Sequence, residues 1–331
     1  MDYARLSPEG PEVSRVIFGA WAVGGWMWGG TDDAKAVEAI QKAVEVGMTT
    51  IDTAPVYGFG HSEEIVGQAI KDHRDQVQIA TKCGLSWDGR EGKDYFQTTD
   101  AEGREVHVYN NLKKDSILEE MDRSLERLGV DYVDLYQCHW PDKGTQPAET
   151  MEALNRILEE GKAKAIGVSN FTPELIAEFR KLGPIVSDQP LYNMLDRGIE
   201  AELLPYCAEN HVGVIVYSPL HQGLLTGAVT MDRAFAEGDQ RNWKPWFKPE
   251  NRRRVLEFLE KVKPIARKHR RTLGQVAVNW CLCQHGVTAA LVGARNPEQV
   301  EENAGAAGWS LTRDELTRIR GWLDELGGPI G

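Results

Sequence analysis

Residues 49–64, with the sequence TTIDTAPVYGFGHSEE, decide the fold and the site of this 331-residue chain. The segment begins as a short apolar strand, continues into a glycine-rich turn and ends where a helix starts. It places a carboxylate, Asp52, at the end of the strand and a phenol, Tyr57, in the turn. Two later strands, ending at Lys82 and His139, add an amine and an imidazole.

These four groups together suit acid–base chemistry. A phenol has an ordinary pKa of about 10. A neighbouring ammonium favours the phenolate and lowers that pKa, and a carboxylate can hold the ammonium in place. A strand-end lysine or histidine by itself is usually structural. The combination predicts a catalytic site made of Asp52, Tyr57, Lys82 and His139.

Strands and helices alternate along the chain, which is typical of a parallel sheet with helical crossovers. Eight strands closed into one ring give a (β/α)8 barrel, which takes about 250 residues, so residues 1–331 are expected to form a single decorated barrel domain. A hairpin is expected around residues 3–16, and an extra C-terminal helix begins after Thr312. The expected barrel strands are residues 16–19, 49–52, 77–81, 132–138, 163–168, 185–189, 212–217 and 289–292.

Two connections are too long to be simple turns. Residues 84–115 and 218–250 are rich in aromatic side chains, and each follows the C-terminal end of a strand, which is the active-site face of such a barrel. We expect both to be substrate loops. The pattern Ser116–Glu119 predicts a capping box at a helix start, and the basic run Arg252–Arg254 is interpreted as a solvated face.

The composition excludes several classes of partner. The net charge of −12 argues against non-specific binding to nucleic acid or to anionic membranes. The sequence has no run of 18 or more apolar residues, so we expect no membrane span, and its start does not resemble a signal peptide. Five cysteines are an odd number, which favours reduced thiols and a cytoplasmic location.

The pattern Asp-Thr-Ala-x-x-Tyr-Gly-x-Gly-x-Ser-Glu over residues 52–63 resembles the signature of the aldo-keto reductase superfamily. The similarity extends from about Arg5 to about Asn303. The amino-acid sequence of residues 21–26 and 54–63 most resembles that of bacterial general-stress and inositol-utilisation aldo-keto reductases. The resemblance implies a barrel that binds a nicotinamide cofactor, usually NADPH, and that reduces aldehydes and ketones or runs in reverse.

By the same resemblance, Tyr57 donates the proton to the carbonyl oxygen. Lys82, paired with Asp52, lowers the pKa of the phenol, and His139 orients the carbonyl. The substrate contacts implied are Trp21, Tyr57, Trp87, His139 and Trp140. Aromatic walls suit aldehydes, ketones, sugars or polyols, and the sequence leaves the choice among them open. No metal site is predicted.

The NADP(H) contacts are implied in the same way. Ser169 and Asn170 would bind the carboxamide, residues 218–225 the pyrophosphate, and Arg295 the 2′-phosphate. Many relatives have lysine and serine in place of residues 293–294 and arginine in place of Gln299, so a modest preference for NADP is expected. The whole set is Gly19, Ala20, Trp21, Asp52, Ser169, Asn170, Gln189, Tyr217, Ser218, Leu220, Gln222, Gly223, Leu225, Gly293, Arg295, Gln299, Glu302 and Asn303.

Two other functions were weighed against the reductase. The β subunits of voltage-gated potassium channels share this fold and the four catalytic groups, so a regulatory NADP-binding subunit is the alternative function. Steady turnover of aldehydes would separate the two. A hydrolase or lyase barrel would need paired carboxylates or a metal cluster at the strand ends, which the sequence does not offer.

Overall fold

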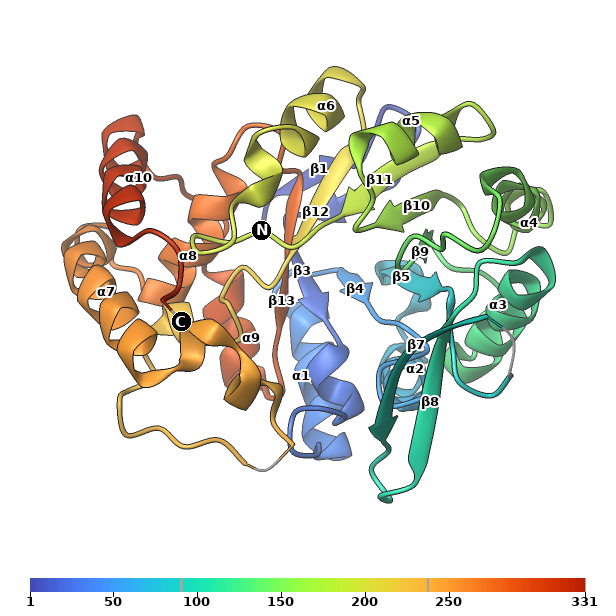
Figure 1. The fold of residues 1–331 in the computed structure, drawn as a ribbon, viewed down its shortest axis with the longest axis horizontal. Coiled ribbons are helices and arrows are strands. Elements are labelled where there is room, and N and C mark those ends of the chain that lie inside the picture. The colour runs from blue at the N-terminus through green and yellow to red at the C-terminus, as the bar shows by residue number, and fades with distance from the viewer. Residues whose placement is uncertain (90–91, 237, 331) are drawn as a thin grey trace.

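The computed structural model describes residues 1–89, 92–236 and 238–330 and has at its centre a closed barrel of eight parallel strands (Figure 1). The expected (β/α)8 architecture is therefore confirmed. The strands, in order around the barrel, are β3 (Val16–Gly19), β4 (Thr50–Asp52), β5 (Gln78–Cys83), β9 (Leu135–Cys138), β10 (Ile166–Ser169), β11 (Ile185–Gln189), β12 (Gly213–Tyr217) and β13 (Ala289–Gly293).

Helices surround the barrel because each strand needs a crossover to reach its parallel neighbour. Side-chain caps start several of them, as the sequence predicts: Thr172 caps α5, and Thr312 forms a capping box with Glu315 at α10. The helices are α1 (Asp33–Glu45), α2 (His61–Ile70), α3 (Lys114–Leu128), α4 (Pro147–Glu159), α5 (Pro173–Arg180), α6 (Leu203–Glu209), α7 (Pro249–His269), α8 (Leu273–Leu282), α9 (Pro297–Ala304) and α10 (Arg313–Leu326).

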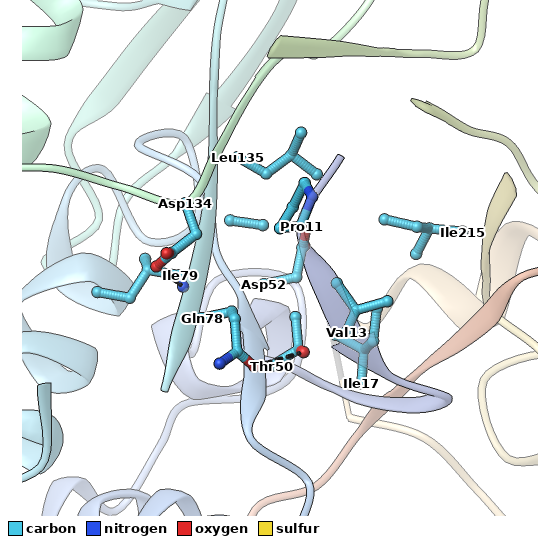
Figure 2. Close-up of a pocket in the computed structure, with 11 residues that line it drawn as sticks. Pro11, Val13, Ile17, Thr50, Asp52, Gln78, Ile79, Asp134, Leu135 and Ile215 are labelled. Atoms are coloured by element: carbon cyan, nitrogen blue, oxygen red, sulfur yellow. Dashed lines mark hydrogen bonds between the residues drawn. The ribbon is translucent and has the colours of Figure 1, made fainter. Parts of the chain in front are cut away.

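A hairpin of β1 (Tyr3–Arg5) and β2 (Glu12–Ser14) closes the N-terminal end of the barrel. Figure 2 shows Pro11 and Val13 of this hairpin beside side chains from the barrel strands, around a cavity of about 10 Å³, the size of one water. Leu6 and Val13 join the apolar side chains of the barrel interior in one buried cluster. A Cβ at Gly213 would lie 2.3 Å from the Leu6 carbonyl oxygen, so the close approach of the hairpin requires glycine there.

The two long connections differ from each other. The first contains an antiparallel sheet of β6 (Leu85–Ser86), β7 (Lys93–Thr99) and β8 (Glu105–Asn110), which the sequence pattern does not predict. The Asp100 carboxylate closes the β7–β8 turn by accepting a hydrogen bond from the backbone N–H of Arg104. The second connection has no strand among its described residues; it is built from short 3-10 turns, η4 (Leu224–Thr226), η5 (Gln240–Trp243) and η6 (Pro245–Phe247).

Two local predictions were wrong. Helix α3 begins at Lys114, two residues before Ser116, so Ser116 lies in the first turn and donates to Glu120 rather than forming a capping box. Arg252 is buried rather than solvated, because its guanidinium donates to backbone carbonyls of the second connection, including those of Arg233 and Phe247.

Among the helices of the described residues, none combines the length and the apolar character that a membrane span needs.

Candidate active site

A buried ion pair lies at the C-terminal rim of the barrel. The Lys82 ammonium, at the end of β5, is 2.5 Å from Oδ1 of Asp52, at the end of β4. It also donates to the Thr53 carbonyl (2.8 Å) and to the Tyr57 hydroxyl (3.3 Å). The side chains of Lys82 and Asp52 are 0% and 2% exposed. Because water does not reach the pair, protein groups alone fix the position of the ammonium.

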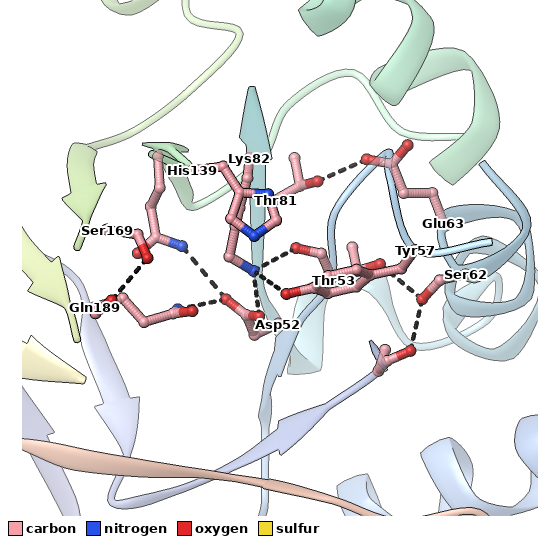
Figure 3. A network of polar contacts seen from close by, with 12 residues as sticks. Asp52, Thr53, Tyr57, Ser62, Glu63, Thr81, Lys82, His139, Ser169 and Gln189 are labelled. Carbon is pink, nitrogen blue, oxygen red and sulfur yellow. Dashed lines mark hydrogen bonds and ion pairs between the residues drawn. The ribbon is translucent and has the colours of Figure 1, made fainter. Parts of the chain in front are cut away.

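The second oxygen of Asp52 is also bonded. It accepts a hydrogen bond from Nε2 of Gln189 at 2.8 Å and another from Nε2 of Gln137 at 3.3 Å (Figure 3 shows the Gln189 contact). Gln137 faces Lys82 in the β5–β9 register. The sequence analysis missed Gln137, although its alternation with Tyr136 and Cys138 indicated an inward-facing polar side chain. Three donors therefore fix a carboxylate that the fold removes from water.

Tyr57 lies in the glycine-rich turn after β4, where its hydroxyl meets Lys82. The turn requires glycine at position 58, because φ is +67° there and a Cβ would lie 2.3 Å from the Gly24 carbonyl oxygen. Burial, together with the charge of Asp52, raises the pKa of Tyr57 well above its usual value. The expected net lowering of this pKa is therefore wrong, because burial and Asp52 outweigh the ammonium of Lys82, and Tyr57 is held as a protonated phenol.

His139 faces Tyr57 with ring centres 5.7 Å apart and the ring planes nearly perpendicular. Burial and the Lys82 charge lower the pKa of His139 well below its usual value, so the imidazole is neutral. Burial also lowers the pKa of Lys82, while the Asp52 charge acts in the opposite direction. The site thus holds one neutral acid, one neutral imidazole and one ion pair.

A second carboxylate supports this arrangement from behind. Glu63, in the first turn of α2, is completely buried and accepts the Thr81 hydroxyl at 2.6 Å (Figure 3). Its other oxygen accepts Nε of Arg127 at 2.7 Å. Because Thr81 precedes Lys82, this contact attaches α2 to the catalytic end of β5. The Ser-Glu at the end of the quoted segment therefore has a structural role that the sequence analysis did not assign.

These side chains open into a cavity of about 720 Å³. Small-molecule and cofactor pockets commonly range from about 300 to 1,000 Å³. Trp21, Tyr57, His139 and Trp140 line it, as the sequence predicts. Trp87 does not: its ring packs against Phe59, with Arg127 over its face. The aromatic lining also includes four side chains that were not individually predicted as contacts: Trp26, Trp28, Tyr95 and Phe96.

One side of the cavity carries a connected set of amide and hydroxyl groups. Tyr217 donates to Oδ1 of Asn170 (3.0 Å), Asn170 donates to the Ser169 hydroxyl (2.9 Å), and Ser169 donates to the Gln189 carbonyl (2.7 Å). Because Nε2 of Gln189 is engaged by Asp52, its Oε1 is the atom that can accept an N–H from a ligand. This set suits a carboxamide held beside a flat ring on Tyr217.

The other end of the cavity carries cations on loops. Arg295 lines it and is exposed, and within residues 1–89, 92–236 and 238–330 its guanidinium makes one hydrogen bond, to the Trp28 carbonyl at 3.5 Å. Its backbone N–H is taken by the Gln299 side chain, and the Gln299 N–H by Asn296. Two of the backbone amides around the start of α9 are therefore already engaged by side chains, and the guanidinium is the charged group that an anion there would meet. Arg233 and Arg241 of the second connection also line this end.

Most predicted cofactor contacts line the same cavity, but two do not. Ala20 and Leu225 are completely buried. Residues next to them in their turns line the cavity instead. The residues that do line it are Gly19, Trp21, Asp52, Ser169, Asn170, Gln189, Tyr217, Ser218, Leu220, Gln222, Gly223, Gly293, Arg295, Gln299, Glu302 and Asn303.

An eight-stranded barrel with an acid, a buried ion pair and a large cavity at its C-terminal rim is the arrangement that the resemblance to aldo-keto reductases, a class of oxidoreductase, implies. The Aldo/keto reductase family model matches residues 15–324, and the chain belongs to that family. It is 38% identical to the aldo-keto reductase YhdN of Bacillus subtilis (strain 168), over 100% of this chain and 96% of the relative. It is 41% identical to the NADH-specific methylglyoxal reductase of Escherichia coli (strain K12), over 95% and 96%.

A solved structure with the same architecture is that of the glycerol dehydrogenase AKR11B4 from Gluconobacter oxydans. It is 39% identical in sequence and superposes with a TM-score of 0.89, covering 100% of this chain and 98% of that one. The family resemblance and the barrel fold are thus confirmed from both sequence and structure. No group of three or more metal-ligating side chains was found among the described residues.

Proposed function

We propose that the chain is an NADP(H)-dependent carbonyl reductase, or the corresponding alcohol dehydrogenase in the reverse direction. The observation that carries this proposal is the Tyr57 hydroxyl, 3.3 Å from the Lys82 ammonium and on the wall of the cavity. The carboxamide-type set of Ser169, Asn170 and Gln189 lines the same cavity and fits a nicotinamide. A reduced nicotinamide, when bound, supplies the hydride.

The residues of the chain then handle the proton and the charge. Tyr57 gives its proton to the carbonyl oxygen, since its raised pKa keeps it protonated. Lys82 donates a hydrogen bond to the phenol oxygen, so it stabilises the negative charge that grows there as the proton leaves. Neutral His139 donates to the carbonyl oxygen and orients it. Asp52 keeps Lys82 charged and in place.

The substrate we propose is a neutral aldehyde, ketone, sugar or polyol. The rings of Trp21 and His139 lie beside Tyr57, with centres 6.0 Å and 5.7 Å away, and they give this part of the cavity an aromatic wall. Two relatives are named for methylglyoxal and for glycerol, both small neutral molecules with oxygens on adjacent carbons. The five cysteines are all free thiols, which supports action in the reducing cytoplasm.

The proposed preference for NADP over NAD is modest. Arg295 is available for a 2′-phosphate, but Gln299 contributes no charge and instead binds the Arg295 backbone. The 41% identical relative from Escherichia coli is named as NADH-specific, which supports measurable use of NADH by this chain as well.

A regulatory subunit is the second candidate. A relative from Arabidopsis thaliana that is 34% identical is named a probable voltage-gated potassium channel subunit beta. A spectrophotometric screen of aldehydes, ketones, sugars and polyols with both cofactors separates the candidates. Steady multiple turnover of at least one small carbonyl supports the reductase. Tight cofactor binding with only a single slow turnover would replace it with the regulator.

A further inference from the structure

The turn after β12, residues 218–223, has an unusual backbone. Ser218, His221 and Gln222 have positive φ angles of 56°, 44° and 54°. Residues other than glycine rarely adopt this region, and they stay there only when the surrounding structure holds them. The turn borders the large cavity, so its conformation decides which backbone groups face a ligand.

One side chain of this turn differs from its neighbours. Ser218, Pro219, Leu220, Gln222 and Gly223 all line the cavity, whereas His221 does not. His221 is 7% exposed and points into the protein. Its Nδ1 lies 2.8 Å from the Asp196 carboxylate.

The partner of His221 is itself firmly held. Asn193, which is completely buried, donates to the same Asp196 oxygen (2.9 Å) and to the Ser218 carbonyl (3.1 Å). Burial opposes ionisation of Asp196, but the hydrogen bonds and charge of His221 and the bond from Asn193 lower its pKa overall. An ionised carboxylate therefore attaches the turn at His221, and Asn193 attaches it at Ser218.

The same imidazole contacts a later part of its own connection. The His221 ring stacks on Phe247 of η6, with ring centres 5.7 Å apart and an angle of 19°. Phe247 in turn meets Phe235 edge to face. His221 thus joins the Asn193–Asp196 turn to two parts of the second connection: the cavity turn itself and the later stretch that carries Arg233 and Arg241.

The turn held in this way has two free backbone donors on residues that line the cavity. The backbone N–H groups of Leu220 and Gln222 donate to no group within the described residues. Free amides flanking a left-handed residue make a concave anion site of the kind that binds phosphates. A dinucleotide has a pyrophosphate, which both NAD and NADP share.

We propose that His221, through Asp196, is the positioning residue that holds this phosphate-binding turn in its strained conformation. The inference rests on the proposed nicotinamide-dependent function. It places a determinant of affinity for both cofactors in a side chain that does not line the cavity. His221→Ala should therefore weaken NADPH and NADH binding alike, by about tenfold or more, while kcat at saturating cofactor changes little.

Three substitutions at position 221 separate the side-chain contact from the backbone strain. Asparagine tolerates positive φ and carries a donor near the position of Nδ1. Glycine removes the strain and also the contact. Fluorescence titration with NADPH and NADH should therefore show near-native affinity for His221→Asn and weak binding for His221→Ala and His221→Gly. Native affinity in His221→Gly would overturn the proposal, because backbone freedom alone would then suffice.

His211 provides a matched control, since it also has a positive φ (56°) but is exposed and does not line the cavity. His211→Ala should leave both affinities unchanged. Asp196→Asn tests the other half of the pair without altering the turn itself. It should weaken both cofactors, and its effect should not multiply with that of His221→Ala.

The outcomes distinguish the two proposals. If the unmodified protein binds neither cofactor, the proposed function is wrong. If it binds both and His221→Ala binds them equally well, or loses NADPH alone, the role of His221 is wrong. Melting curves for every variant show whether the titrated protein is folded, and a folded Asp196→Asn with native affinity would also overturn the proposal.

Discussion

The two ends of the large cavity are built in different ways. At the catalytic end, Lys82 and Asp52 are almost completely buried, and each makes several bonds of 2.5 to 3.3 Å to groups on barrel strands and the turn after β4. At the opposite end, Arg295 is exposed, lies on a loop, and its guanidinium makes a single hydrogen bond, of 3.5 Å, to the part of the chain that the structure describes. The catalytic groups are therefore held by bonds within the barrel, whereas Arg295 lies on a loop outside it.

This difference has consequences for function. A group held by several buried bonds cannot be replaced without leaving unpaired donors or charges, so the acid and its ion pair are constrained. An exposed arginine can be changed at little cost to the fold. Relatives that share the barrel can therefore differ in cofactor, as the name of the NADH-specific relative illustrates. Substitutions at the two ends should differ in size and in what they alter.

The largest effect is expected at the proton donor. Tyr57→Phe removes only the hydroxyl, so kcat for carbonyl reduction should fall by about 10²–10⁴-fold while cofactor affinity stays near its starting value. Steady-state kinetics with fluorescence titration measure both. Tyr95→Phe is the matched control, because Tyr95 lines the same cavity and its loss of hydroxyl should leave kcat unchanged. Near-native kcat in Tyr57→Phe would remove this residue from the mechanism.

A comparable loss is expected for Lys82→Met, because the phenol oxygen loses the donor 3.3 Å away. It also leaves Asp52 buried without its counter-charge, so the melting temperature should fall as well, unlike in Tyr57→Phe. The double variant should be little slower than either single one, since the two residues act as a unit. Losses that multiply would contradict the coupling.

A smaller effect concerns pH. Tyr57 has a raised pKa, so its active protonated form is present below that pKa and is lost only as the pH rises through it. His139 has a lowered pKa, so it stays neutral until the pH falls well below about 6.5. kcat for reduction at saturating cofactor should therefore be flat between about pH 6.5 and 8.5. A rise or fall of kcat inside that pH range would show that one of these groups titrates there.

The catalytic end is also the part that the sequence predicted best. Strand periodicity and the segment 49–64 locate the barrel, and the register then brings Asp52, Lys82 and His139 to one rim. Gln137 escaped prediction because its role depends on which strand lies opposite, which local pattern does not encode. The sign of the Tyr57 pKa was also missed, since burial outweighs the nearby ammonium and burial is a property of the whole fold.

The loops around both ends of the cavity were predicted less well for a related reason. The β7–β8 hairpin and the 3-10 turns have little periodicity, so loop residues such as Arg233 and Phe96 reach the cavity through tertiary contacts alone. Trp87 and Leu225 fail in the opposite sense, because a shift of one or two positions in a loop turns a side chain away from the cavity. Arg252 is a further case of tertiary contacts deciding the outcome. It belongs to a run of three arginines that predicted exposure, yet its guanidinium is buried.

The smallest effect is expected from Arg295→Ala, and it tests the comparison most directly. NADP differs from NAD by one phosphate, so discrimination must come from groups that meet that phosphate. A charge-assisted hydrogen bond contributes about 1.5–3 kcal/mol, or roughly tenfold to a hundredfold in affinity. Because Arg295 is exposed, solvent and salt screen its charge, and the lower end of that range is expected. NADPH should therefore bind about tenfold more weakly, less so at high salt, while NADH and kcat stay nearly unchanged. Arg253→Ala, which removes an exposed arginine that does not line the cavity, is the control. Equal weakening of both cofactors would place Arg295 on the shared pyrophosphate or adenine, and a fall in kcat would show that the two ends are coupled rather than separate.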